Sequence, residues 1–123
     1  MVELRRELVQ EDGSFRVTLD PATLGECSHV LCSASTLLNG SVERMLGFCH
    51  ASAQVAVIGP TAGCVPDPLF RRGVHHVGAT AVADPEELLV AMSAGDPWKG
   101  AVSKYVIEAD AYPGWEALLA RTV

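Results

Sequence analysis

Long hydrophobic runs and basic clusters are missing from this chain of 123 residues. No segment approaches the roughly 18 consecutive apolar residues of a membrane span, and Glu3, Arg5 and Arg6 stand near the N-terminus, so neither a transmembrane helix nor a signal peptide is predicted. The net charge is −6, and the pairs Arg5-Arg6 and Arg71-Arg72 are too small for a nucleic-acid footprint. We therefore expect a cytoplasmic protein that binds neither membranes nor nucleic acids.

Standard cofactor and metal motifs are also missing. No GxGxxG follows a strand-like segment and no GxxxxGK[ST] occurs, which argues against a standard dinucleotide or P-loop enzyme. The 4 cysteines are irregularly spaced without a CxxC pair, so in a cytosolic chain we expect reduced thiols, with Cys32 as a small buried side chain. No repeat or linker divides the sequence, and residues 1–123 are predicted to form one domain.

Apolar runs alternate with helical patterns along most of the chain. Runs at residues 29–33, 54–58, 74–77 and 102–107 predict strands. Helices are predicted at residues 21–26, 36–50, 68–72, 85–94 and 115–120, from helical spacing and from Asp-Pro starts. Such alternation is typical of parallel sheets with helical crossovers. The predicted fold class is α/β, Rossmann-like, with a mostly parallel sheet flanked by helices.

The N-terminal residues show a different pattern. Two partly alternating apolar runs, at residues 2–9 and 15–19, flank the pair Asp12-Gly13. Such a pair between two apolar runs is typical of a tight hairpin turn. We therefore expect an N-terminal antiparallel β-hairpin with Asp12-Gly13 at its tip.

The loop after the run at residues 54–58 is the first candidate site. The strand runs directly into Gly59, Pro60 and Thr61, which can continue neither a strand nor a helix. In open α/β sheets, ligands bind at the carboxyl ends of the strands. Gly59, Pro60 and Thr61 are therefore candidate ligand-binding residues.

The turn Ser33-Ala34-Ser35-Thr36, between a predicted strand and a predicted helix, is the second candidate site. Backbone N–H groups and a helix N-terminus would favour an anion or a carboxylate there. Ser33, Ser35 and Thr36 are candidate ligand-binding residues, with helix capping by Ser35 and Thr36 as the alternative. Asn39 lies one turn further, where its amide binds either a ligand or the neighbouring loop.

Cys64, His75 and His76 are the candidate metal ligands, because thiolate and imidazole bind zinc, copper, nickel and iron. Adjacent residues on a strand point to opposite faces, so one histidine with Cys64 is geometrically easier than both. The alternative is a scatter of cysteine and histidine without a site, since no close ligand pairs occur. Cys64 as a nucleophile would need an activating histidine, and neither loop contains a carboxylate for acid–base catalysis.

Several motifs resemble a known family, DUF364, described as putative heavy-metal chelation. Its T-G-S-T-L-x-N-x-T segment is similar to Ser33-Ala34-Ser35-Thr36-Leu37-Leu38-Asn39-Gly40-Ser41, and its GPS loop resembles Val57-Ile58-Gly59-Pro60-Thr61. Further matches in the family's order are Pro68-Leu69-Phe70, Gly73-Val74, Gly78 and Asp84-Pro85. The resemblance, over residues 28–105, implies a Rossmann-like C-terminal domain that binds a metal or a metal-bearing compound, with a link to anaerobic cobalamin synthesis.

The sequence departs from the family pattern in three places. Ser33-Ala34 stands in place of Thr-Gly, Ser41 in place of Thr, and residues 61–64 in place of Ser-Thr-Pro, although most hydroxyls are kept. The family's usual N-terminal domain is expected to be absent, because too few residues precede the first motif. Losing a covering domain should expose apolar surface, so we expect a homodimer or a larger assembly.

The predicted function is a binding domain for a small anionic ligand, a metal ion or a metal complex, in a cleft formed by the two strand-end loops. One alternative is an enzyme or enzyme subunit acting on such a ligand, in cobalamin-related metabolism. Another is an interaction module. The cofactor stays unknown, and a transition metal is the candidate.

Overall fold

The computed structural model describes residues 1–122, and for Lys99 the backbone alone. Its strands are β1 (Gln10–Asp12), β2 (Phe15–Val17), β3 (His29–Ser33), β4 (Gln54–Ile58), β5 (His76–Val82) and β6 (Val102–Glu108). Its α-helices are α1 (Ser35–Leu38), α2 (Val42–Leu46), α3 (Asp67–Phe70), α4 (Pro85–Ala94) and α5 (Trp115–Ala120). Short 3-10 helices are η1 (Arg6–Leu8), η2 (Pro21–Glu26), η3 (Pro60–Ala62) and η4 (Lys99–Ala101).

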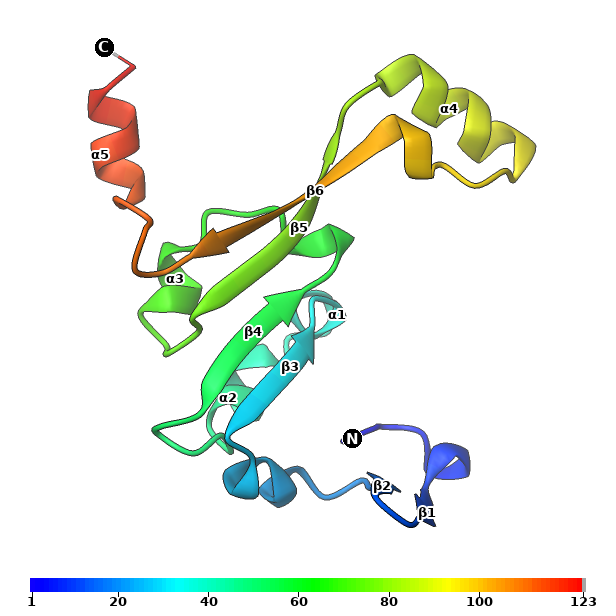
Figure 1. Ribbon diagram of the computed structural model, residues 1–123, viewed down its shortest axis with the longest axis vertical. Coiled ribbons are helices and arrows are strands. Elements are labelled where there is room, and N and C mark those ends of the chain that lie inside the picture. The colour runs from blue at the N-terminus through cyan, green and yellow to red at the C-terminus, as the bar shows by residue number, and fades with distance from the viewer. Residues whose placement is uncertain (123) are drawn as a thin grey trace.

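The main sheet has four strands in the order β3-β4-β5-β6 (Figure 1). β3, β4 and β5 are parallel, and β6 returns antiparallel to β5. This confirms the predicted α/β class with a mostly parallel sheet. The strands at residues 29–33 and 54–58 have the predicted bounds.

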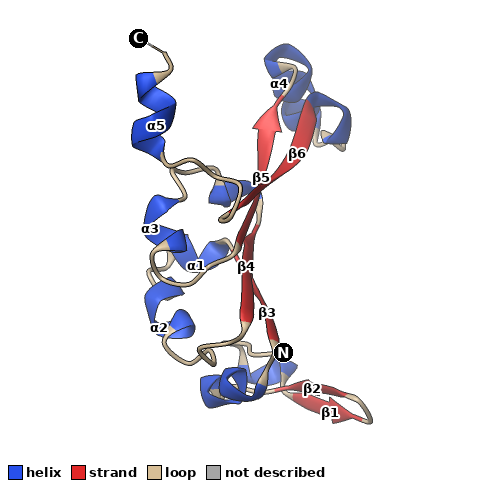
Figure 2. Ribbon diagram, turned by 60° about the vertical axis from the view of Figure 1, so that its left-hand side comes forward, coloured by secondary structure: helices blue, strands red, loops and turns tan. Residues whose placement is uncertain are grey.

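Helices cover one face of the sheet. In Figure 2, α1, α2, α3 and α5 lie on the same side of the strands. The strand order runs in one direction from β3 to β5, so right-handed crossovers place both connections on the same face. Val30, Cys32, Val55 and Val57 point to this face and are buried, whereas the alternate positions of β3 and β4 are mostly exposed.

The N-terminal hairpin forms, but not from the predicted first strand. A two-residue turn pairs Asp12 with Phe15, and Gly13 in the turn has φ +55°. The turn thus fixes residues 10–12 as the partner strand. The prediction of a strand at residues 2–9 is wrong, because this segment folds into η1 and, in the described chain, joins the hairpin region through an isolated bridge from Val2 to Thr18.

The predicted long helix at residues 36–50 is also wrong, because it is divided into α1 and α2. Gly40 has φ +70°, which a continuous helix cannot accommodate. The Asn39 side chain accepts a hydrogen bond from Ser41 N at 3.0 Å, so the chain turns before α2 begins.

The third strand of the sheet starts later and ends later than predicted. β5 runs from His76 to Val82, and residues 78–80, which lie beyond the predicted strand, pair with β6. The predicted helix start at Asp84 is confirmed, since its Oδ1 accepts hydrogen bonds from Glu86 N and Glu87 N. Gly95 ends α4 with φ +72°. Among the described residues, none of the helices has the length and hydrophobicity required to cross a bilayer.

Candidate functional site

The two predicted loops lie side by side at the carboxyl ends of β3 and β4. Ala34 N donates a hydrogen bond to Ile58 O at 2.9 Å, and Gly59 N donates to Gly78 O at 2.9 Å. Gly59 has φ +155°, and a Cβ atom added there would lie 2.8 Å from the Cβ of Ala34. The second loop can therefore approach the first this closely because residue 59 is glycine.

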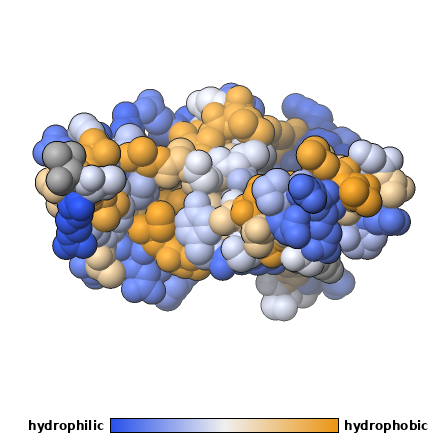
Figure 3. Space-filling model, turned by 90° about the horizontal axis from the view of Figure 1, so that it is seen from above, coloured by the Kyte–Doolittle hydropathy of each residue, from blue (hydrophilic) through white to orange (hydrophobic). Residues whose placement is uncertain are grey.

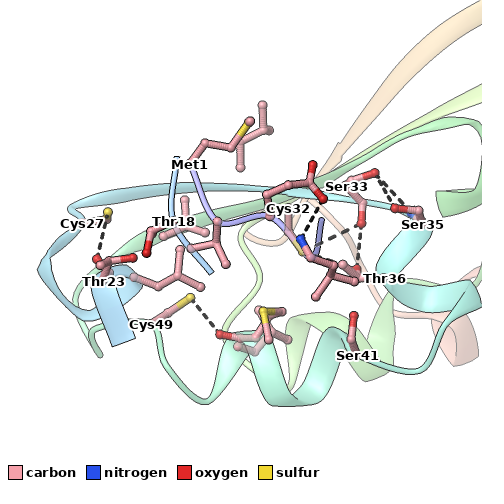
Figure 4. A pocket seen from close by; sticks show the side chains of 18 of the residues that line it. Met1, Thr18, Thr23, Cys27, Cys32, Ser33, Ser35, Thr36, Ser41 and Cys49 are labelled. Carbon is pink, nitrogen blue, oxygen red and sulfur yellow. Dashed lines mark hydrogen bonds between the residues drawn. The ribbon is translucent and has the colours of Figure 1, made fainter. Parts of the chain in front are cut away.

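A cavity of about 650 Å³ lies on the opposite side of the first loop, along the free edge of β3 (Figure 4). We call it the β3 cavity. The N-terminal residues Met1 to Leu4, η2, α1 and α2 contribute to its walls. Its lining includes the predicted site residues Ser33, Ser35, Thr36 and Asn39. Gly59, Pro60 and Thr61 are not among the lining residues, so these two halves of the predicted site do not share this cavity.

The hydroxyl groups of the first loop bond to one another. Ser33 Oγ lies 2.9 Å from Ser35 Oγ and accepts a hydrogen bond from Ser35 N at 3.3 Å. Thr36 Oγ1 donates to Ser33 O at 2.7 Å and lies 3.3 Å from Cys32 Sγ. These bonds hold the loop in one conformation. Because α1 has 4 residues, the helix N-terminus predicted to attract an anion is reduced to a single turn.

Asn39 makes the local hydrogen bonds that were one of the two alternatives for it. Its Oδ1 accepts hydrogen bonds from Ser41 N at 3.0 Å and from Ser41 Oγ at 2.6 Å, which holds the following turn. Within residues 1–122, its Nδ2 makes no hydrogen bond to the protein, and the residue is exposed. The amide N–H groups of Asn39 are therefore available to a ligand in the β3 cavity.

The predicted metal ligands do not come together. Cys64 is exposed in the loop beyond the carboxyl end of β4, whereas His75 and His76 lie at the start of β5, at the other end of the sheet. His75 Nδ1 accepts a hydrogen bond from Val55 N at 3.2 Å, which gives it a structural partner. Within residues 1–122, no three His, Cys, Asp or Glu side chains are placed to hold a metal ion. The loop that carries Cys64 is separated from the two histidines by part of the length of the strands.

Three other cysteines, Cys27, Cys32 and Cys49, line the β3 cavity. Cys27 follows η2, Cys32 lies in β3 and Cys49 follows α2. No short spacing in the sequence therefore indicates that they are neighbours. Burial, followed by the nearby thiols of Cys32 and Cys27, raises the pKa of Cys49 above its ordinary value of 9.0. Burial thus disfavours the thiolate form of Cys49, the form that ligates metal ions.

The charged groups of the β3 cavity are mixed in sign. Glu3 and Glu26 provide carboxylates, whereas Arg16 and His29 provide the basic groups. The N-terminal amine of Met1 donates to Arg16 O at 2.6 Å, which ties the N-terminal residues to the hairpin. The contribution of the N-terminal residues to the wall of the β3 cavity was not predicted, because the apolar pattern placed residues 2–9 in a strand.

The fold and this site define the class of the protein: a Rossmann-like α/β domain with a largely apolar cavity that carries a few polar groups, beside a hydroxyl-rich strand-end loop. The family model of DUF364, described as "Putative heavy-metal chelation", matches residues 1–108. The chain belongs to the DUF364 family, as its motifs predicted.

Three similar proteins are described as uncharacterised or of unknown function. An uncharacterised protein of Methanocaldococcus jannaschii is 28% identical over 102 residues, which cover 80% of this chain and 39% of that one. A crystal structure of a DUF364 protein of unknown function from Pyrococcus horikoshii has a TM-score of 0.70 at 26% identity, covering 87% of this chain and 45% of that one. Another DUF364 structure, from Desulfitobacterium hafniense, has a TM-score of 0.66 at 17% identity; the match covers 80% of this chain and 41% of that one. The chain therefore spans less than half the length of each relative.

Proposed function

We propose that the protein binds a small anionic compound or a metal complex in the β3 cavity. The main support is the position of the cavity beside Ser33–Asn39, the segment through which the sequence most clearly resembles DUF364. The cavity, of about 650 Å³, falls within the range of small-molecule sites. Its wall offers hydroxyl groups, one amide and basic side chains, which suit the oxygen atoms of such a compound.

A bare metal ion fits this chain poorly. Transition-metal sites normally need three or four protein donors at bonding distance, and no such group exists among the described residues. Burial also raises the pKa of Cys49, one of the thiols that line the cavity, which disfavours the thiolate that a metal ion would bind. If the family's heavy-metal description applies to this protein, the metal would arrive already bound to an organic or carboxylate ligand, which the protein would recognise.

The second loop has a positioning role in this proposal. Gly59 packs against Ala34, and Ala34 is hydrogen-bonded to β4, so η3 supports the loop that lines the cavity. Ser33, Ser35, Thr36 and Asn39 would contact the ligand, whereas Gly59, which packs against Ala34, would hold the contacting loop in place. The ligand thus lies beside the first loop rather than between the two.

The experiment compares three probes: Co²⁺ alone, citrate alone and the Co²⁺–citrate complex. We expect citrate or its complex to raise the melting temperature, and Co²⁺ alone to have no effect. The Asn39→Ala variant should bind about tenfold more weakly or worse, because it loses a hydrogen bond to a charged group. Thr61→Ala, in the second loop, is the matched control and should bind normally.

Two results would contradict the proposal. One is a wild-type protein that responds to Co²⁺ alone, which would indicate a bare-ion site. The other is a loss of binding in Thr61→Ala with normal binding in Asn39→Ala, which would return the site to a cleft between the loops.

A further inference from the structure

The solvent-exposed area is larger than a folded chain of this mass normally leaves. The molecule exposes 8586 Å² at 13.0 kDa, whereas a compact monomer of that mass exposes roughly 6,300 Å². The excess is roughly 2,200 Å². Seen from the end that bears α4 and α5, the surface shows several hydrophobic patches (Figure 3). This chain therefore leaves exposed an area that folded monomers bury.

Part of this area is the face of the main sheet opposite the helices, which we call the bare face. In residues 1–122, no helix lies over it (Figure 2). Ile58, Gly78 and Val106 form one row across β4, β5 and β6, because they are direct register partners. Ile58 is 45% exposed and Val106 60%. Leu31 on β3, at 72%, extends the same apolar surface.

The groups that surround these apolar side chains are mixed in charge. His76 pairs with Glu108 in the next row, and Lys104 pairs with Thr80 beyond Val106. A groove of about 390 Å³ crosses β3, β4 and the start of β5 on this side and is lined by Leu31, Ala56 and His76, among others. Parallel strands normally have helices on both faces, so a face like this one is normally covered by another layer.

Helix α4, in contrast, is a helix with an exposed apolar surface that packs on no sheet of its own chain. It stands at the tip of the β5–β6 ribbon, away from the body of the molecule, and its main contact is η4 (Figure 1). Leu89, Val90 and Met92 are 66%, 70% and 63% exposed. A helix of 10 residues is marginal in water without a packed face.

From these observations we infer that a second copy of the chain covers the bare face, with α4 of each protomer packed on the sheet of the other. The missing helical layer and the unpacked helix complement each other. One chain cannot join them by itself, because the ribbon holds α4 beyond the end of its own sheet. Two copies related by a two-fold axis make both contacts at once.

The excess exposed area is large enough for the interface of such a dimer. Obligate homodimers bury roughly 2,000–5,000 Å² in total, so each protomer contributes about 1,000–2,500 Å². The excess of roughly 2,200 Å² per chain lies inside this range. In the relatives, more than half of each chain lies outside the matched region, so in them other parts of the same polypeptide are available to this face. The dimer does not depend on the ligand proposed for the β3 cavity.

The test uses analytical ultracentrifugation of the full chain and two single variants. Val106→Lys places a charge on the bare face, and Val90→Glu places one on α4, where Val90 is exposed. We expect a wild-type dimer, and for each variant a dissociation constant raised at least about thirtyfold, as for a central interface residue. Both side chains are largely exposed in the single chain, so the circular dichroism spectra should stay unchanged.

Mixing Val106→Lys with Val90→Glu tests the pairing of α4 with the sheet. A mixed dimer keeps one unaltered contact, and in the other contact the introduced lysine faces the introduced glutamate, so we expect dimers to return. If sheets paired only with sheets, Val90→Glu would stay dimeric by itself, and if α4 paired only with α4, Val106→Lys would. Neither arrangement predicts that both variants dissociate alone and dimerise when mixed. Recovery therefore supports the inference, and its absence overturns it.

A control variant places the same charge on the helical side. Leu119 on α5 is 57% exposed, and α5 lies on the opposite face of the sheet from the bare face. Leu119→Lys should remain dimeric. Dissociation of Leu119→Lys, or a wild-type chain that is monomeric at high micromolar concentration, overturns the inference; a monomer would leave the face to a different polypeptide.

Discussion

At the scale of single residues, the contact between Gly59 and Ala34 decides how the two loops meet. A Cβ atom on residue 59 would lie 2.8 Å from the Cβ of Ala34, at a backbone φ of +155°. Both the steric overlap and the backbone conformation oppose any other residue. This one position therefore links the loop after β4 to the loop that lines the β3 cavity.

We predict that Gly59→Ala lowers the free energy of unfolding by about 2–4 kcal/mol. Urea denaturation measures the effect. Gly40→Ala is the matched control, since Gly40 also has a positive φ (+70°) but nothing lies within 4 Å of an added Cβ. It should cost only about 1 kcal/mol. Equal losses in the two variants would show that the loops do not pack as described.

Single residues also show which parts of the site could be predicted from the sequence. The hydroxyl-rich turn and Asn39 were candidate site residues because they follow the carboxyl end of a predicted strand, and they line the β3 cavity. Cys27 and Cys49 were not grouped with Cys32, since their proximity depends on how η2 and α2 pack beside β3. Cys64 and His75 were grouped, although the length of the sheet separates them.

At the scale of elements, the strongest local signals produced the best predictions. Strands β3 and β4 have the predicted bounds, because buried apolar runs ending in small residues leave few alternatives. The helix at residues 36–50 failed, because its apolar spacing continues through Asn39-Gly40, where the backbone turns. Periodicity does not register a single positive φ, whereas Gly after Asn is a common turn signal.

Helix α4 has few contacts with the rest of its own chain, mainly with η4, so its first turn contributes strongly to its stability. Asp84 Oδ1 accepts hydrogen bonds from Glu86 N at 3.0 Å and from Glu87 N at 2.9 Å. We predict that Asp84→Ala weakens α4 by about 1 kcal/mol, which accelerates amide hydrogen exchange in α4 about fivefold. Asp20→Ala, which removes the comparable cap on Ala22 N in η2, should leave exchange in α4 unchanged. Unchanged exchange in Asp84→Ala would show that other contacts hold the helix.

At the scale of the whole molecule, the sequence predicted the class of fold but not its one-sidedness. Alternating strands and helices imply a sheet flanked by helices, whereas the side on which each crossover lies follows from strand order. Because β3, β4 and β5 are consecutive neighbours, their connecting helices all lie on one face. The expected homodimer was argued from a missing domain, whereas our proposal of a dimer rests on the bare face and the large exposed area.

An assembly of this kind couples folding to protein concentration. If unfolding separates two chains, a tenfold rise in concentration adds about 1.4 kcal/mol to the stability of the dimer. We predict that the urea midpoint of the wild-type chain rises with concentration, and that the midpoint of Val106→Lys does not. Leu119→Lys should behave like the wild type. A wild-type midpoint that stays constant over a roughly hundredfold concentration range would mean that the bare face and α4 remain exposed in a chain that folds alone.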